Sequence, residues 1–166
     1  MNIPVVIYES LTGNTRKAGE RIARELAASG VSAVACPVLE IDYPALAAAD
    51  LVIIGTWTDG MVLFGQRPGR VGRLWTKIPA LDRKKTALSC TFAVAPGQTL
   101  VKLESLVTDH HGADVVGGLA IRRNRIEPAA ETFVDRPLAP APAPVVAPTR
   151  PASLLAPPPR PPPPAP

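Results

Sequence analysis

The chain has 166 residues, with 18 lysines and arginines, 14 aspartates and glutamates, 21 prolines and two cysteines. A net charge of +4 is too small to predict nucleic-acid binding, and Cys36 and Cys90 form no CxxC motif that would predict a metal site or a disulfide framework. No apolar stretch reaches the roughly 18 residues of a membrane-spanning helix, and no basic segment precedes an apolar run near residue 1, so we expect a cytoplasmic protein.

The prolines gather at one end of the sequence. Residues 137–166 hold 14 of the 21 prolines, and proline cannot join a helix or sheet ladder because it lacks a backbone donor and has a fixed φ. We therefore expect a disordered Pro/Ala-rich tail over residues 137–166. Residues 1–136 would form one folded domain, long enough to bury a core. The tail has two interpretations, an inert spacer or a polyproline II ligand.

Strands and helices are expected to alternate along this domain. In chain order we expect a strand at 3–8, a helix at 14–29, a strand at 31–38, a short helix at 43–49, a strand at 51–56, a helix at 67–77, a strand at 85–93, a helix at 98–110, a strand at 114–121 and a helix at 127–135. The first and third strands are short apolar runs, typical of strands buried on both faces. In the first helix, Ala18, Ile22 and Leu26 recur at helical spacing, and Gly30 suits its C-terminal end.

This alternation predicts an α/β fold, a parallel sheet with helices on both faces. Residues 127–135 leave room for only about two helical turns before the prolines, so we expect a shortened last helix. The sheet face beside it would then be incompletely covered and would bind a partner, such as a second copy of the chain in a homodimer. The alternative is that the tail folds back over this face.

The loop after the first strand has the composition of a phosphate site. It consists of Ser10, Leu11, Thr12, Gly13, Asn14 and Thr15. Gly13 permits a tight turn, the helix that follows adds unpaired N–H groups and the positive end of its dipole, and the hydroxyl side chains add further donors. The loop lacks the lysine of GxxxxGK[ST] and the glycine spacing of GxGxxG, which disfavours ATP, GTP and NAD. An ordinary helix N-cap is the alternative interpretation.

The pattern Ser10-x-Thr12-Gly13-Asn14-Thr15, after an apolar strand and before a helix, resembles the FMN-phosphate loop of the flavodoxin family. The resemblance covers about residues 3–121. It implies a flavodoxin-like, doubly wound five-stranded parallel sheet and FMN as the cofactor. It also implies a function in electron transfer with a redox partner protein, and that residues 10–15 hold the FMN phosphate.

By the same resemblance, two further loops would line the flavin ring. The loop after the third strand contributes Thr56, Trp57, Thr58, Asp59 and Gly60, and the loop after the fourth strand contributes Thr91, Phe92 and Ala93. We expect Trp57 to stack on the flavin, because an indole and a flat apolar ring bury large areas against each other. Phe92 stands where the family usually has a tyrosine. For both aromatic side chains, packing in the core is the alternative.

Arginines recur at every third position beside the second of these loops. Arg67, Arg70 and Arg73 would recruit an acidic redox partner or an anionic substrate group, or would form a solvated basic face.

Taken together, the three loops and the resemblance predict an FMN-binding electron carrier. Two alternatives remain, a flavin-free interaction module of the same fold and a small flavin-dependent NAD(P)H or quinone reductase.

Overall fold

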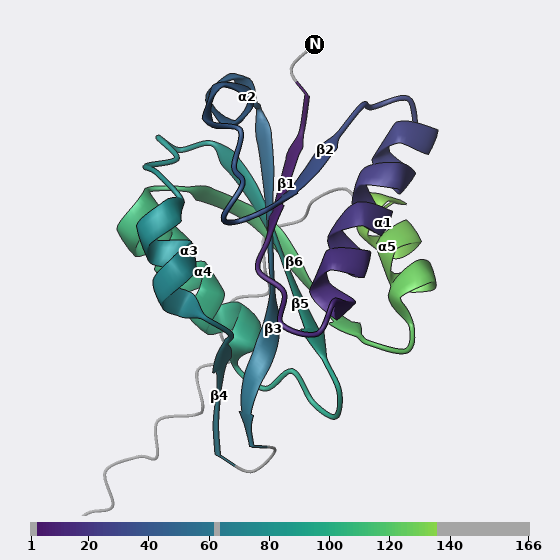
Figure 1. Ribbon diagram of the computed structural model, residues 1–166, viewed down its shortest axis with the longest axis vertical. Helices are drawn as coiled ribbons and strands as arrows, with labels where there is room; N and C mark the ends of the chain where they lie inside the picture. The colour runs from purple at the N-terminus through teal and green to yellow at the C-terminus, as the bar shows by residue number, and fades with distance from the viewer. Residues whose placement is uncertain (1–2, 62–63, 136–166) are drawn as a thin grey trace, which may run out of the picture.

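A computed structural model describes residues 3–61 and 64–135 of the chain (Figure 1). In chain order the elements are β1 (Val5–Tyr8), α1 (Asn14–Ala28), β2 (Val34–Pro37), α2 (Tyr43–Ala48), β3 (Leu51–Met61), β4 (Phe64–Pro68), α3 (Val71–Lys77), β5 (Lys85–Phe92), α4 (Thr99–His111), β6 (Asp114–Arg122) and α5 (Ile126–Asp135). The predicted tail at 137–166 lies outside the described residues. Within the described ranges, no helix is long and apolar enough to cross a membrane.

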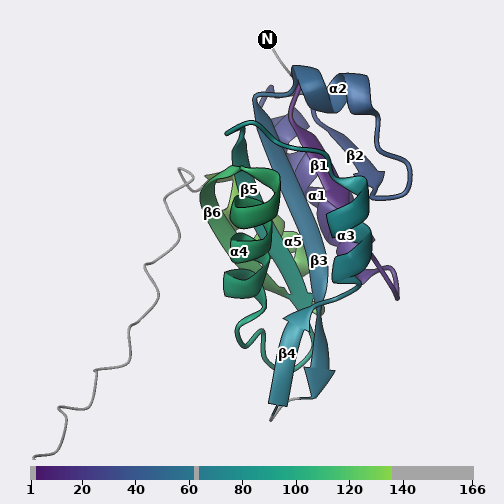
Figure 2. The same cartoon turned by 90° about the vertical axis from the view of Figure 1, so that its left-hand side faces the viewer.

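Five strands form the parallel sheet that the sequence predicts. Their order is β2-β1-β3-β5-β6, with β1 in parallel register beside both β2 and β3 and β5 parallel to both β3 and β6. Helices α1 and α5 cover one face of the sheet, and α3 and α4 cover the other (Figures 1 and 2). The predicted doubly wound α/β fold with five parallel strands is confirmed.

The core has two layers, one on each face of the sheet. Alternate residues of one strand enter different layers: Val5 and Ile7 pack with Leu74 of α3 and Leu103 of α4, whereas Val6 packs with the side chains of α1 and α5. All of these side chains are buried. Burial on both faces explains why β1 and residues 51–54 of β3 are continuous apolar runs instead of an alternation of apolar and polar residues.

The β3–β4 hairpin corrects the predicted secondary structure. We expected a strand that ends at residue 56, then a glycine-rich loop, and a helix from residue 67. Instead, β3 continues to Met61 and pairs with β4 in antiparallel register, with Thr58 opposite Pro68 and Asp59 opposite Arg67. Gly60 adopts a φ of 109°, which favours glycine, and α3 begins only at Val71. The residues that we assigned to a loop therefore extend the sheet beyond its carboxyl edge (Figure 2).

The last helix is short, as predicted, and its buried side chains pack in the same core layer as those of α1. Helix α5 has 10 residues and lies beside α1 (Figure 1), where Ala130 and Phe133 are buried and Arg21 of α1 pairs with Glu131 at 3.2 Å. Neither α1 nor α5 has an exposed large apolar side chain. The incompletely covered patch that we expected is therefore not found on these two helices.

Candidate functional site

The loop between β1 and α1 ends in an uncapped helix N-terminus. Gly13 occupies the N-cap position in the left-handed region, with φ 87°, and no side chain caps α1. The Gly13 N–H donates to Ser10 Oγ at 3.1 Å, and the Asn14 side-chain N–H donates to Thr12 Oγ1 at 3.1 Å. The internal hydrogen bonds of the loop thus use hydroxyl oxygens as acceptors.

These hydrogen bonds leave the hydroxyl donors of the loop free for an anion. A hydroxyl that accepts a hydrogen bond still has its own O–H to donate, so Ser10 and Thr12 each keep a donor. The first turn of α1 contains no acidic residue, and a side chain added at Gly13 would meet open space. An uncapped N-terminus on a helix of 15 residues, with hydroxyl donors beside it, is a favourable environment for a phosphate group.

Thr15 has a different environment from the other hydroxyl residues of the loop. Its side chain is 2% exposed and shares a hydrogen bond of 2.8 Å with the hydroxyl of Thr91 at the end of β5. This contact joins the first turn of α1 to the end of β5. Thr15 therefore fixes the position of one predicted site loop relative to another.

A cavity of about 110 Å³ lies between the three loops that the sequence singled out. Its lining residues are Leu11, Thr12, Asn14, Trp57, Thr58, Thr91, Phe92, Ala93 and Arg123. Ser10 and Gly13 line a neighbouring hollow of about 230 Å³ together with Arg16 and Arg73. Most of the predicted site residues thus come together at the carboxyl edge of the sheet, where ligands of doubly wound folds bind.

Six predicted residues do not line this cavity: Ser10 and Gly13 line the neighbouring hollow, Thr15 is buried behind the loop, and the other three belong to β3. Thr56 is fully buried and donates a hydrogen bond to the Gly69 carbonyl at 3.0 Å. Asp59 lies further along the β3–β4 hairpin, where its carboxylate is 3.6 Å from Arg67, and Gly60 follows it. The extension of β3 explains this placement, because a strand advances along its axis whereas a tight loop would turn back toward the cavity.

Trp57 lies at the surface of the cavity, half-buried, and not in the core. Its ring packs closely against Gly69, leaving no room there for a side chain. The guanidinium carbon of Arg70 lies 5.8 Å from the ring centroid, within the range of a cation–π contact. Gly69 and Arg70 thus hold the indole in place beside the cavity.

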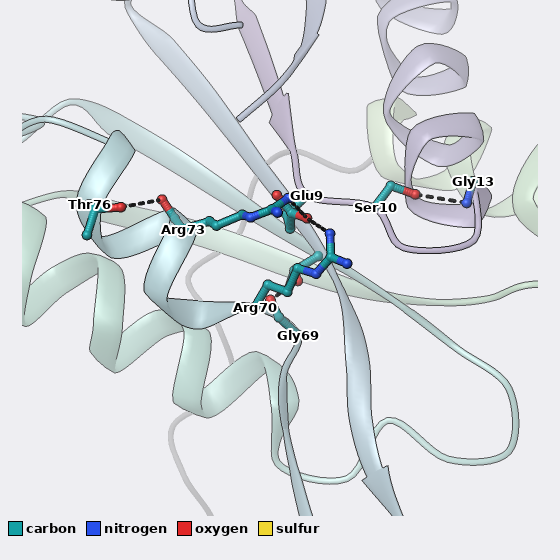
Figure 3. Close-up of polar contacts among 8 residues, drawn as sticks. Glu9, Ser10, Gly13, Gly69, Arg70, Arg73 and Thr76 are labelled. Carbon is teal, nitrogen blue, oxygen red and sulfur yellow. Dashed lines mark hydrogen bonds and ion pairs between the residues drawn. The ribbon is translucent and has the colours of Figure 1, made fainter. Parts of the chain in front are cut away.

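A buried carboxylate lies next to the same loop (Figure 3). The side chain of Glu9, the residue after β1, is 4% exposed and lies 3.2 Å from Arg70 and 3.3 Å from Arg73. Figure 3 shows both arginines reaching Glu9 from the start of α3, with Ser10 following it in the chain. Arg70 has a φ of 45°, an uncommon conformation for a residue with a side chain. Glu9, Arg70 and Trp57 thus form a continuous chain of contacts beside the loop.

A comparison with protein families identifies the family of the chain. A model described as the flavodoxin domain matches residues 5–102. The chain belongs to the flavodoxin family. No curated protein matches its sequence.

Solved flavodoxins share this fold at low sequence identity. The two-electron reduced flavodoxin of Megasphaera elsdenii is 18% identical with a TM-score of 0.59, and the match covers 81% of this chain and 100% of that one. Oxidised flavodoxin 2 of Bacillus cereus is 21% identical with a TM-score of 0.60, and the match covers 80% of this chain and 97% of that one. The Flv1 flavodiiron core of Synechocystis sp. PCC6803 is 18% identical with a TM-score of 0.56, and the match covers 78% of this chain and 34% of that one.

FMN is the cofactor of the flavodoxin family, and the residues around the β1–α1 loop fit its phosphate end. The free hydroxyl donors and the uncapped N-terminus of α1 suit a phosphate monoester, which needs fixed donors. The cavity of about 110 Å³ is smaller than the 300–1,000 Å³ typical of pockets that enclose a whole small molecule. The cavity is therefore too small to enclose the whole cofactor.

Glu9 and Arg123 are two features of this flavodoxin-like site that the sequence analysis missed. Arg123 lines the cavity, and its backbone N–H donates to the Phe92 carbonyl at 2.9 Å. Because Arg123 directly follows the last strand of the sheet, its place at the carboxyl edge could have been inferred from the strand order. For Glu9 the sequence offered less: a single carboxylate between an apolar strand and the loop, which does not indicate a buried ion pair.

The two cysteines are expected to be unreactive in the folded flavodoxin domain. Burial raises the pKa of the Cys90 thiol to about 11 and also raises the pKa of the Cys36 thiol. A raised pKa lowers the thiolate fraction, which for Cys90 at pH 8 is on the order of 0.1%. A thiol reagent at pH 8 should therefore modify neither cysteine rapidly in the folded chain and both after unfolding in urea. The Cys36→Ser variant isolates Cys90, and rapid modification of that folded variant would contradict its burial.

Proposed function

We propose that this chain binds FMN through residues 10–15 and carries electrons between redox partner proteins. The observation that supports the proposal is the uncapped N-terminus of α1, which opens beside a cavity that also contacts Trp57 and Phe92. Flavodoxin-family membership supports an FMN-dependent electron-transfer function in general. The donor set of this particular loop supports retention of the cofactor by this chain.

Each part of the site has its own function in this proposal. The hydroxyls of Ser10 and Thr12, with the first N–H groups of α1, hold the phosphate. Trp57, which Arg70 and Gly69 position, provides an apolar surface for the ring, and Thr58 with residues 91–93 lines the remaining cavity. When bound, FMN supplies the redox chemistry, and the protein sets its position and surroundings.

The small volume of the cavity is also consistent with a second candidate function. A cavity of about 110 Å³ would also be expected in a flavodoxin-fold interaction module that binds a protein and no flavin. The two candidates differ in one property that is simple to measure. Only the electron carrier should take up FMN.

Spectroscopy of the reconstituted chain tests the proposal. We expect the full chain, incubated with excess FMN and freed of unbound flavin, to keep the flavin absorption bands and to release FMN on denaturation. A chain that keeps no flavin would favour the interaction module. Rapid NADPH oxidation by the reconstituted protein alone would instead favour a reductase.

Three further predictions concern the chain as a whole. The domain boundary near residue 136 and the cytoplasmic location remain predictions from the sequence. So does the homodimer, for which α1 and α5 offer no exposed large apolar side chain.

A further inference from the structure

The turn after β6 gathers exposed positive charge beside the candidate site. Arg122 is the last residue of β6, and Arg123 and Arg125 follow it before α5. All three are exposed. The Arg125 N–H donates to the Arg122 carbonyl at 2.8 Å, so the three side chains leave from one tight turn.

These arginines differ from the arginines of β4 and of the start of α3 in having no acidic partner among the described residues. Arg70 and Arg73 both pair with Glu9, and Arg67 pairs with Asp59. None of Arg122, Arg123 and Arg125 forms an ion pair with another residue in the described ranges 3–61 and 64–135. Their charges are therefore free to attract an anionic group from outside the molecule.

Exposed apolar side chains lie next to this charge. Leu11 lines the cavity and is 56% exposed, and Val94, which follows the cavity residue Ala93, is 64% exposed. The β5–α4 loop at residues 93–98 contains no charged residue. Arg123 belongs both to the cavity lining and to the arginine turn, so the apolar and the cationic surfaces are continuous.

We propose that residues 122–125, with Leu11 and Val94, form a docking surface for an acidic redox protein. A centre of exposed apolar groups with arginine at its rim is the usual anatomy of a protein interface, and unpaired cations favour a partner of opposite charge. Such a partner would dock directly over the cavity. This inference rests on the proposed electron-carrier function, and it adds the charge of the partner.

Binding to two proteins of opposite charge tests the proposal without requiring flavin. We expect the full chain to bind an acidic blue-copper protein in calorimetry at low salt, more tightly than it binds basic cytochrome c, and to lose affinity as salt is added. The Arg122→Gln/Arg125→Gln variant should weaken binding of the acidic protein about tenfold. The matched control Arg24→Gln/Lys85→Gln removes two exposed charges elsewhere and should leave the affinity nearly unchanged.

Several outcomes of this experiment would overturn the proposal. Equal losses of affinity in the two double variants would show that only the net charge of the chain matters. Tighter binding of basic cytochrome c than of the acidic protein would show that the surface prefers a partner of the opposite charge to the one proposed. Absence of binding to the acidic protein, combined with arginine-dependent binding to anionic lipid vesicles, would assign the surface to a membrane instead.

Electron transfer separates this proposal from the proposed function. The reduced FMN-loaded chain should give one electron to each ferricyanide ion, forming ferrocyanide, and two equivalents should reoxidise it fully with release of protons to solvent. We expect added salt to slow this reaction and to accelerate the reaction with cationic hexaamminecobalt(III). A chain that binds no FMN would contradict the proposed function alone. A loaded chain with the opposite or no salt dependence would contradict the docking surface alone.

Discussion

Replacing Arg70 and Arg73 together by glutamine is expected to lower the free energy of unfolding by about 3 kcal/mol. The reason is that Glu9, whose side chain is 4% exposed, would keep its charge in the interior without the two cations that face it. Removing one side of a buried ion pair typically costs about 3–5 kcal/mol, and the glutamine amides, which still donate hydrogen bonds, place the effect at the lower end. Urea unfolding of the apoprotein followed by circular dichroism measures this loss.

A third substitution tests whether Glu9 is the cause. Adding Glu9→Gln to the double variant removes the uncompensated charge and should recover much of the lost stability. As a control, Arg67→Gln breaks only the exposed contact with Asp59 at 3.6 Å and should cost less than about 1 kcal/mol. If the triple variant were no more stable than the double variant, the loss would come from packing of the arginine side chains and not from charge.

The Ser10→Ala/Thr12→Val variant is expected to bind FMN at least about 100-fold more weakly than the native chain. Each substitution removes one hydroxyl donor from the phosphate, and a hydrogen bond to a charged group contributes about 1.5–3 kcal/mol. Riboflavin lacks the phosphate, so its affinity should hardly change. Titration of the flavin-free variant with each flavin, followed by fluorescence, measures both constants.

A control variant separates loss of the loop donors from a general loss of structure. The Thr76→Val variant removes a hydroxyl that donates to the Gly72 carbonyl within α3, away from the cavity lining, and should leave FMN affinity unchanged. Equal losses for FMN and riboflavin in the Ser10→Ala/Thr12→Val variant would mean that the hydroxyls shape the site without holding the phosphate.

The sheet and most of the helices could be predicted from the sequence because burial on two faces has a simple signature. Residues 52–54 of the apolar run at 51–54 are buried, so its local pattern identifies the strand. The β3–β4 hairpin has no such signature. Thr58 and Asp59 are polar residues beside Gly60, a composition typical of loops, and only pairing with β4 makes them a strand.

The loops of the candidate site could be located from the sequence, but not the contacts between them. Strand order brings Thr12, Trp57 and Phe92 to one edge, since parallel strands end together. From the sequence, Arg70 and Arg73 would recruit an acidic partner or an anionic group, or would form a solvated basic face, and neither interpretation included the contact with Glu9 that the structure shows. Contacts between residues about 60 positions apart depend on the packing of α3 against the sheet, which local sequence patterns do not specify.

The measurement that tests FMN binding by this chain most directly is a titration of the flavin-free full chain with FMN and with riboflavin. We predict that FMN fluorescence is quenched at one flavin per chain with a Kd in roughly the micromolar range or below, and that riboflavin binds at least about tenfold more weakly because it leaves the phosphate donors unused. Unchanged FMN fluorescence at tens of micromolar protein, or equal affinity for both flavins, would contradict a phosphate site at the N-terminus of α1.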